Sequence, residues 1–243
     1  MATVAFTKPR VVPRAEWLDA RKKLLAKEKE LTRAKDALAA ERRQLPMVRI
    51  GKDYVFEGAS GKVSLADLFG GRSQLIVNHF MFGPEWEEGC IGCSFAADHV
   101  NGGLSHLLQR DVAYVAVSRA PYAKLAAFKE RMGWDFEWVS SFESDFNFDF
   151  SVSFPKEAEK RGEIEYNYAV QPFYNDEMSG LSVFYKDEDG AVFHTYSTFG
   201  RGAEETLPAY FLIDLTPKGR DETGPTGSLA DWVKLHDQYG GAG

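Results

Sequence analysis

Two cysteines are the residues of this chain whose type and spacing most directly suggest chemistry. Cys90 and Cys93 are its only cysteines, and they are separated by Ile91 and Gly92. Two thiols at this spacing can close into a disulfide, or they can supply two ligands to a metal ion. A secreted fold held by disulfides would normally carry more cysteines, so we expect a catalytic or metal-binding role in preference to a structural one.

A metal site would need further ligands beside the two thiols. His99 and His106 follow the cysteines and would share one face of a helix, yet both lie far along its axis from the sulfur atoms. Zinc sites built on Cys-x-x-Cys normally add a second ligand pair at fixed spacing. We therefore expect a redox dithiol with no bound metal; a metal site and a pair of inert buried thiols are the alternatives.

The residues around the cysteines predict a strand followed by a helix. Residues 74–82 form a nearly continuous apolar run typical of a buried central strand, and residues 90–109 predict a helix weakened by Gly102–Gly103. Cys90 would then stand at the helix N-terminus, where unpaired N–H groups and the helix dipole favour a thiolate. Cys93 lies one turn inward, within reach of Cys90. We predict Cys90 as the nucleophile and Cys93 as the resolving thiol, with no organic cofactor.

Several residues near the pair are candidate site neighbours. Gly92 leaves the approach to the first cysteine open, and Trp86 is expected to cover the site. His79 stands near the end of the buried strand, and the carboxyl ends of strands are where α/β sites form. The carboxylates of Glu87 and Glu88 would raise the pKa of a nearby thiol and so oppose the helix dipole. The sequence does not decide between these two effects.

The rest of the chain alternates strands and helices, which argues for parallel strands joined by right-handed crossovers. Further short elements are expected as strands at 48–50, 54–56, 111–117 and 136–139, and as helices at 64–69, 121–132 and 229–239. Residues 181–185 and 191–196 flank an acidic turn that ends at Gly190, and they predict an antiparallel hairpin. The aromatic-rich stretch 141–154 predicts either an irregular loop or a half-buried strand.

The N-terminal region predicts one long, highly charged helix over residues 14–45, which ends before Pro46. Its apolar residues recur at an interval of seven and form a narrow seam: Trp17, Leu24, Leu31, Leu38 and Leu45. Such a helix either packs along its own domain or pairs with a second subunit, so a homodimer through this helix is one expectation. We expect residues 1–46 to form an N-terminal helical extension and residues 47–243 to form the main domain.

Charge and hydropathy exclude several classes of partner. The chain has 243 residues, a net charge of −7 and a pI near 5.4, and its field repels nucleic acid and anionic membranes. No apolar window of about 18 residues is present, so no membrane span is expected. The N-terminus lacks the apolar stretch of a secretory signal. We therefore expect a cytoplasmic protein with neither a nucleic-acid nor a membrane partner.

Six short motifs follow one another along the chain: Gly89-Cys90-Ile91-Gly92-Cys93-Ser94, Val117-Ser118-Arg119-Ala120-Pro121, Arg131-Met132-Gly133-Trp134, Ser144-Asp145-Phe146-Asn147, Phe193-His194-Thr195-Tyr196-Ser197-Thr198, and Trp232 with His236-Asp237-Gln238-Tyr239. Through them the whole chain resembles a bacterial family of unknown function described as predicted dithiol-disulfide oxidoreductases. The stretch 65–138 also resembles the thioredoxin-like superfamily, in particular its peroxiredoxin-like members.

These resemblances imply an α/β fold, a thioredoxin-like three-layer sandwich with a mixed central sheet and helices on both faces. The N-terminal helical extension and an aromatic-rich insertion around residues 141–178 would be additions to that fold. The first motif also places Ser94 beside the dithiol as a further candidate site neighbour.

The chain departs from the better-known relatives at two places. Thioredoxins carry a cis-proline that faces the cysteine pair, whereas the matching place here, Met178-Ser179-Gly180, has no proline. This difference argues against broad protein-disulfide exchange and makes Ser179 a candidate site neighbour. Peroxiredoxins place a threonine three residues before the peroxidatic cysteine, and here that position is Glu87. This difference argues against peroxide reduction by the usual peroxiredoxin active site.

The sequence thus predicts a thiol-disulfide oxidoreductase whose partners are a protein or small-molecule disulfide and a thiol reductant. Two alternatives stay open. In a thiol-dependent peroxidase, Cys90 would form a sulfenic acid that Cys93 resolves. In a non-catalytic binding module, the Phe-rich second half and the heptad helix would hold a partner.

Overall fold

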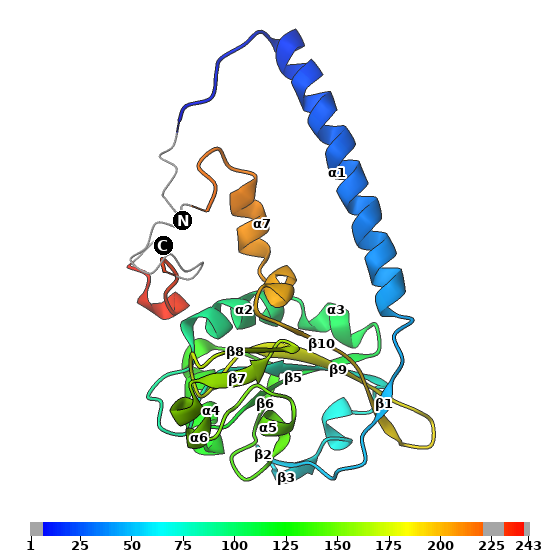
Figure 1. Cartoon of the computed structure of the whole chain (residues 1–243), viewed down its shortest axis with the longest axis vertical. Helices are drawn as coiled ribbons and strands as arrows, with labels where there is room; N and C mark the ends of the chain where they lie inside the picture. The colour runs from blue at the N-terminus through cyan, green and yellow to red at the C-terminus, as the bar shows by residue number, and fades with distance from the viewer. Residues whose placement is uncertain (1–6, 221–230, 241–243) are drawn as a thin grey trace. The chain divides into compact units, whose positions relative to one another are not determined.

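The computed structural model describes residues 7–220 and 231–240, and the chain divides into two compact units at the boundary between Pro46 and Met47. The first unit contains helix α1 (Arg14–Arg42), the long blue helix of Figure 1. No side chain of α1 is buried, and Leu24, Leu31 and Leu38 are 52%, 60% and 55% exposed. The leucines of the predicted seam are thus exposed to solvent.

The second unit is built on one eight-stranded sheet. In spatial order its strands are β1 (Val48–Arg49), β10 (Val192–Phe199), β9 (Gly180–Lys186), β4 (Gln74–His79), β5 (Val112–Ser118), β6 (Glu137–Ser140), β2 (Val55–Gly58) and β3 (Gly61–Ser64). β4, β5 and β6 run parallel, and the other neighbouring pairs are antiparallel. The central order β10-β9-β4-β5, with a helix joining β4 to β5, is the thioredoxin-like arrangement, so the predicted fold is confirmed.

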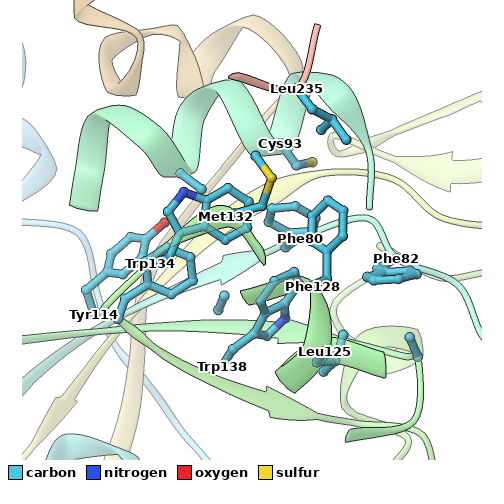
Figure 2. Close-up of a cluster of buried hydrophobic side chains, with 14 residues drawn as sticks. Phe80, Phe82, Cys93, Tyr114, Leu125, Phe128, Met132, Trp134, Trp138 and Leu235 are labelled. Atoms are coloured by element: carbon cyan, nitrogen blue, oxygen red, sulfur yellow. The ribbon is translucent and has the colours of Figure 1, made fainter. Parts of the chain in front are cut away.

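Helices surround this sheet (Figure 1). They are η1 (Asp67–Phe69), α2 (Ile91–Asn101), α3 (Leu104–Leu108), α4 (Tyr122–Met132), α5 (Phe146–Asp149), α6 (Lys156–Arg161), η2 (Gly200–Thr206), α7 (Pro208–Asp214) and η3 (His236–Gln238). One face of the sheet packs against α2 and α4 through an aromatic cluster that includes Cys93 (Figure 2). The other face packs against η1 and α5 through a second cluster. None of the helices in the described ranges is long and apolar enough to span a membrane.

The side chains of β4 alternate between these two faces, as in any strand. Leu75 and Val77 belong to the cluster under η1 and α5, whereas Ile76 packs against the cluster that contains Cys93. Asn78 therefore faces the cysteine side of the sheet, and His79 faces the opposite side.

Several predicted elements are refined by the structure. The hairpin is confirmed: β9 and β10 pair antiparallel, and Gly190 takes a φ of 83°, which glycine adopts without strain. The helix predicted over 90–109 is interrupted at Gly102–Gly103 and becomes α2 and α3. The prediction of a loop or a half-buried strand at 141–154 is wrong in part, because this stretch contains the short helix α5 and no strand. The residues from there to 178 contain α6 and a separate hairpin of β7 (Glu163–Tyr166) and β8 (Ala169–Pro172).

The helix predicted for residues 229–239 is wrong in the part that the structure describes; the first two residues of that stretch lie outside the described part of the chain. A single 3-10 turn, η3, is the helical element present there. Val233 and Leu235 are 4% and 1% exposed, and the residue between them is exposed. This period of two belongs to an extended segment, which buries alternate side chains against the domain.

Candidate dithiol site

The two cysteines lie where the loop after β4 enters helix α2. Cys90 is the N-cap residue, and its backbone N–H donates to the Met81 carbonyl at 3.0 Å. The backbone N–H and the hydroxyl of Ser94 both donate to the Cys90 carbonyl, each at 2.9 Å. Both thiols are free; Cys90 is partly exposed, whereas Cys93 is buried. These bonds fix the first turn of α2 and with it the position of the first sulfur.

The surroundings of the two thiols move their pKa values in opposite directions. The Cys93 S–H donates a hydrogen bond to the Cys90 sulfur, and this bond, aided by the backbone N–H groups of Cys93 and Gly92, lowers the pKa of Cys90 to about 6 against the opposing effect of burial. The same bond and complete burial raise the pKa of Cys93 well above its ordinary value. The surroundings therefore favour the thiolate at Cys90 and the thiol at Cys93.

The acidic residues before the motif do not reverse this effect. The Glu88 carboxylate accepts a hydrogen bond from Arg131 Nη1 at 2.5 Å, and no carboxylate is among the groups that shift the pKa of Cys90. The Arg131 guanidinium also binds Asp237 at 2.7 Å. One arginine of α4 thus holds both the loop before Cys90 and the C-terminal segment.

The dithiol opens into a partly enclosed pocket of about 220 Å³. Its walls come from β4, β5, α2, the start of β9, η2 and α7. The sheet side and α2 contribute Asn78, Met81, Cys90, Gly92, Cys93, Phe95, Ala96, Tyr114, Ser179, Gly180 and Leu181. The side of η2 and α7 contributes Gly200, Arg201, Ala203, Glu204, Thr206, Leu207 and Tyr210. Most of this surface is apolar. Arg201 and Glu204 pair with each other at 3.1 Å.

Aromatic rings hold the outer wall of this pocket against α2. The ring of Phe95 lies 5.2 Å from that of Tyr210 on α7 and 5.7 Å from that of Trp232 in the C-terminal segment. The backbone N–H of Ala209 donates to His99 Nε2 at 3.3 Å. The C-terminal segment is tied to the same helix by a hydrogen bond between His236 Nδ1 and Asp98 Oδ1 at 2.7 Å. The wall is therefore a packed part of the domain.

The structure brings together some of the predicted site neighbours. Gly92 and Ser179 line the pocket with both cysteines. Ser94 is fully buried behind Cys90, where its hydroxyl supports the first turn of α2. Trp86 packs against the same aromatic cluster as Cys90 and is not among the residues that line the pocket.

His79 is not part of this site. It is 1% exposed on the opposite face of the sheet, where its Nε2 lies 2.7 Å from the Ser182 hydroxyl and its ring stacks on Phe146. Burial lowers its pKa to about 3, so the ring is neutral. The sequence placed it at the correct end of the strand but could not tell which face it takes.

The histidines considered for a metal site are engaged elsewhere or exposed. His99 Nδ1 lies 2.6 Å from the Phe95 carbonyl and its Nε2 accepts from α7, while His106 is exposed on α3. Among the residues described here, no group of three His, Cys, Asp or Glu side chains is placed to hold a metal ion.

Two polar residues that the sheet contributes to the pocket were not predicted from the sequence. Asn78 and Tyr114 lie on neighbouring strands, and the Tyr114 hydroxyl is hydrogen-bonded to Asn78 while burial raises the pKa of Tyr114. An isolated asparagine within an apolar strand was the available signal, because a buried amide needs partners. No comparable signal marked η2 and α7.

Solved structures similar to this chain include three with low sequence identity. The peroxidoxin BcpB of Mycobacterium tuberculosis is 17% identical, and the match covers 68% of this chain and 96% of that one with a TM-score of 0.42. Peroxiredoxin Q of Xanthomonas campestris is 14% identical, and the match covers 64% of this chain and 87% of that one with a TM-score of 0.43. A protein of Chlorobium tepidum assigned provisionally as thiol:disulfide interchange protein DsbE is 16% identical, and the match covers 71% of this chain and 99% of that one with a TM-score of 0.41. No curated protein matches the chain. At these identities the similarity concerns the fold only, so the chemistry of this chain has to be judged from its own residues.

A family model matches nearly the whole chain, from residue 6 to residue 239. The match covers both the N-terminal helix and the dithiol domain, as well as the C-terminal segment that packs on α2. This chain therefore belongs to DUF899, a family of bacterial proteins of unknown function.

Proposed function

We propose that this protein is a thiol-disulfide oxidoreductase in which Cys90 is the nucleophile and Cys93 the resolving thiol. The observation that carries the proposal is the asymmetry of the pair: Cys90 lies partly exposed at the N-terminus of α2, whereas Cys93 is buried, and these surroundings lower the pKa of Cys90 and raise that of Cys93. A thiolate attacks a disulfide, whereas a thiol does not. The proposal places the attacking charge on the sulfur that a substrate can reach.

The cycle needs only the two sulfur atoms of the protein. The Cys90 thiolate attacks one sulfur of a substrate R–S–S–R, forms a Cys90–S–R bond and releases RS⁻. Cys93 then loses its proton and attacks the Cys90 sulfur, which closes the Cys90–Cys93 disulfide and releases the second RS⁻. Two electrons pass from the dithiol to the substrate, and an external thiol reductant restores the dithiol. This scheme uses no organic cofactor and suits the reducing cytoplasm.

Trapping the mixed disulfide tests this assignment. In Cys93→Ser, incubation with bis(2-hydroxyethyl) disulfide should add one mercaptoethanol unit to Cys90 and stop there, because no second thiol can displace it. The wild-type protein should instead lose two hydrogens and carry no adduct. Intact mass and peptide mapping distinguish these products.

Cys90→Ser is the matched control, and it should form no adduct under the same conditions because Cys93 is buried, and burial disfavours its thiolate. An adduct on Cys93 in that variant, at a rate similar to that of Cys90 in Cys93→Ser, would reverse the assigned roles. Consumption of cumene hydroperoxide by the wild-type protein, with every disulfide left intact, would contradict the proposal in favour of a peroxidase.

We also propose that α1 pairs with α1 of a second copy in a parallel coiled coil. The seam leucines occupy one heptad position, and Ala20 and Ala34 lie at the second seam position, where Lys27 and Glu41 alternate with them. In a parallel pair the flanking residues meet with opposite charge: Glu16 faces the partner's Arg21, Lys23 faces the partner's Glu28, and Glu30 faces the partner's Lys35. This complementarity favours a second copy over another occupant.

A lysine placed in the seam should break this dimer. Leu31→Lys buries a charge at the centre of the pairing and should weaken dimerisation by at least about tenfold. Ala26→Lys puts the same side chain on the outer face of α1 and should leave the dimer unchanged. Sedimentation of the full chain measures both, and a wild-type monomer at every concentration would refute the pairing.

A further inference from the structure

The pocket that receives the dithiol also restricts what can reach it. We infer that the substrate is a small apolar disulfide, R–S–S–R with short alkyl or aryl R groups, in preference to a polypeptide disulfide or glutathione disulfide. This inference rests on the proposed function and adds the substrate class. It is carried by the size, lining and construction of the pocket beside Cys90 and Cys93.

The lining of the pocket selects apolar groups. Beside the two sulfurs, its walls are formed mainly by Met81, Phe95, Ala96, Leu181, Leu207 and Tyr210. Each methylene that leaves water for such a surface strengthens binding by about fourfold. A charged or strongly hydrated R group would lose its water shell there without gaining matching partners.

The charged residues of the lining do not change this preference. The Glu204 carboxylate is bound by both Arg201 and Arg220, and Arg220 also binds Asp214 and stacks over the Tyr210 ring at 4.5 Å. The charges therefore compensate one another within the protein. They hold η2 and α7 together and leave neither a surplus anion nor a surplus cation to attract an ionic substrate.

The size of the pocket excludes large substrates. A volume of about 220 Å³ lies below the roughly 300–1,000 Å³ of pockets that hold drug-sized ligands. The wall formed by α7 is packed on α2 through Phe95, Tyr210 and Trp232. An R group larger than this volume would have to displace the wall to lie beside the sulfurs, whereas a short alkyl group fits without displacement.

A series of disulfides tests the inference. Reduced protein is mixed with dimethyl, diethyl or dipropyl disulfide, and the second-order rate constant of thiol loss is measured. This rate constant is divided by that of free dithiothreitol with the same disulfide, which removes the intrinsic reactivity of the disulfide. This ratio should rise by about fourfold per methylene buried. Bis(2-hydroxyethyl) disulfide matches dipropyl disulfide in shape but ends in hydroxyl groups, and its ratio should be lower by about tenfold or more. Glutathione disulfide and insulin should react more slowly still.

A variant that fills the pocket provides the second readout. Ala96→Leu adds three carbon atoms to a pocket-lining helical position and should abolish the chain-length preference while iodoacetamide still alkylates Cys90. Ala127→Leu makes the same change at an exposed position of α4 and should behave as the wild type. If Ala96→Leu does not fold, Ala203→Leu on η2 makes an equivalent change in the opposite wall.

The outcomes separate this inference from the proposed function. Ratios that are equal for all the disulfides, or that are highest for glutathione disulfide or insulin, would overturn the apolar-substrate inference and leave the oxidoreductase intact. An absence of reaction with every disulfide, together with no trapped adduct on Cys90, would overturn the proposed function itself.

Discussion

The rate at which iodoacetamide alkylates Cys90 should rise with pH through a midpoint near 6 and then level off. The thiolate is the reacting form, and the pKa of Cys90 is lowered to about 6 mainly by the hydrogen bond from the Cys93 S–H. Cys93→Ala removes that donor, so the midpoint should move upward by about one pH unit or more. Below pH 6 this shift means about a tenfold loss of thiolate.

Cys93→Ser is the matched control for this measurement, because its hydroxyl can still donate to the Cys90 sulfur. Its midpoint should lie below that of Cys93→Ala. Each variant has a single cysteine, so intact mass reports the alkylation of Cys90 directly. A wild-type midpoint near the ordinary cysteine value, or one that Cys93→Ala leaves in place, would remove the basis for assigning Cys90 as the nucleophile.

The two glycines of the dithiol motif should respond in opposite ways to alanine. A Cβ atom on Gly89 would lie 2.7 Å from Phe80 Cε1 and 3.0 Å from Phe128 Cε1, and both rings are buried in the aromatic cluster. Overpacking of this kind costs about 1–3 kcal/mol. We expect Gly89→Ala to lower the free energy of unfolding by about this amount. It should also slow the alkylation of the neighbouring Cys90, because the loop has to shift.

Gly92→Ala is the paired substitution and should be tolerated. The nearest atom to its Cβ would be the Cys90 sulfur at 3.9 Å, an ordinary van der Waals contact, and the residue lies within α2. Alanine is a better helix former than glycine, so the free energy of unfolding should rise by about 0.5–1 kcal/mol. Urea unfolding of both variants measures the difference, and equal effects at the two positions would contradict this packing explanation.

The fold and the setting of the dithiol could be predicted because they depend on local patterns. The apolar run 74–82, the break at Gly83–Pro84 and the helix that begins beside Cys90 are each visible within a few residues. The order of parallel crossovers then limits the topology. The helix prediction at 229–239 was wrong because the buried side chains there recur at every second residue, as in an extended segment, and not at helical spacing.

The electrostatics and the walls of the site could not be predicted. The pKa of Cys90 depends on a hydrogen bond between two side chains, and the backbone N–H groups of Cys93 and Gly92 add to its effect. The face of the sheet on which His79 lies depends on how β4 pairs with its neighbours. In the structure Asn78, and not His79, faces the cysteines. The outer wall of the pocket is formed by η2 and α7, and no sequence motif predicted that these elements would line the site.

The construction of the pocket also bears on how the protein folds. The C-terminal segment is tied to α2 by the hydrogen bond of His236 to Asp98 and to α4 by the ion pair of Asp237 with Arg131, which join residues 138 and 106 positions apart. Contacts of such long range form late, since the entropy of closing a long loop has to be met before they stabilise the chain. In a partly folded chain Cys90 and Cys93 are two ordinary, accessible thiols. The dithiol acquires its pocket, and Cys93 its burial, only once distant parts of the chain have come together, so the access of substrates to the site is tied to the completion of folding.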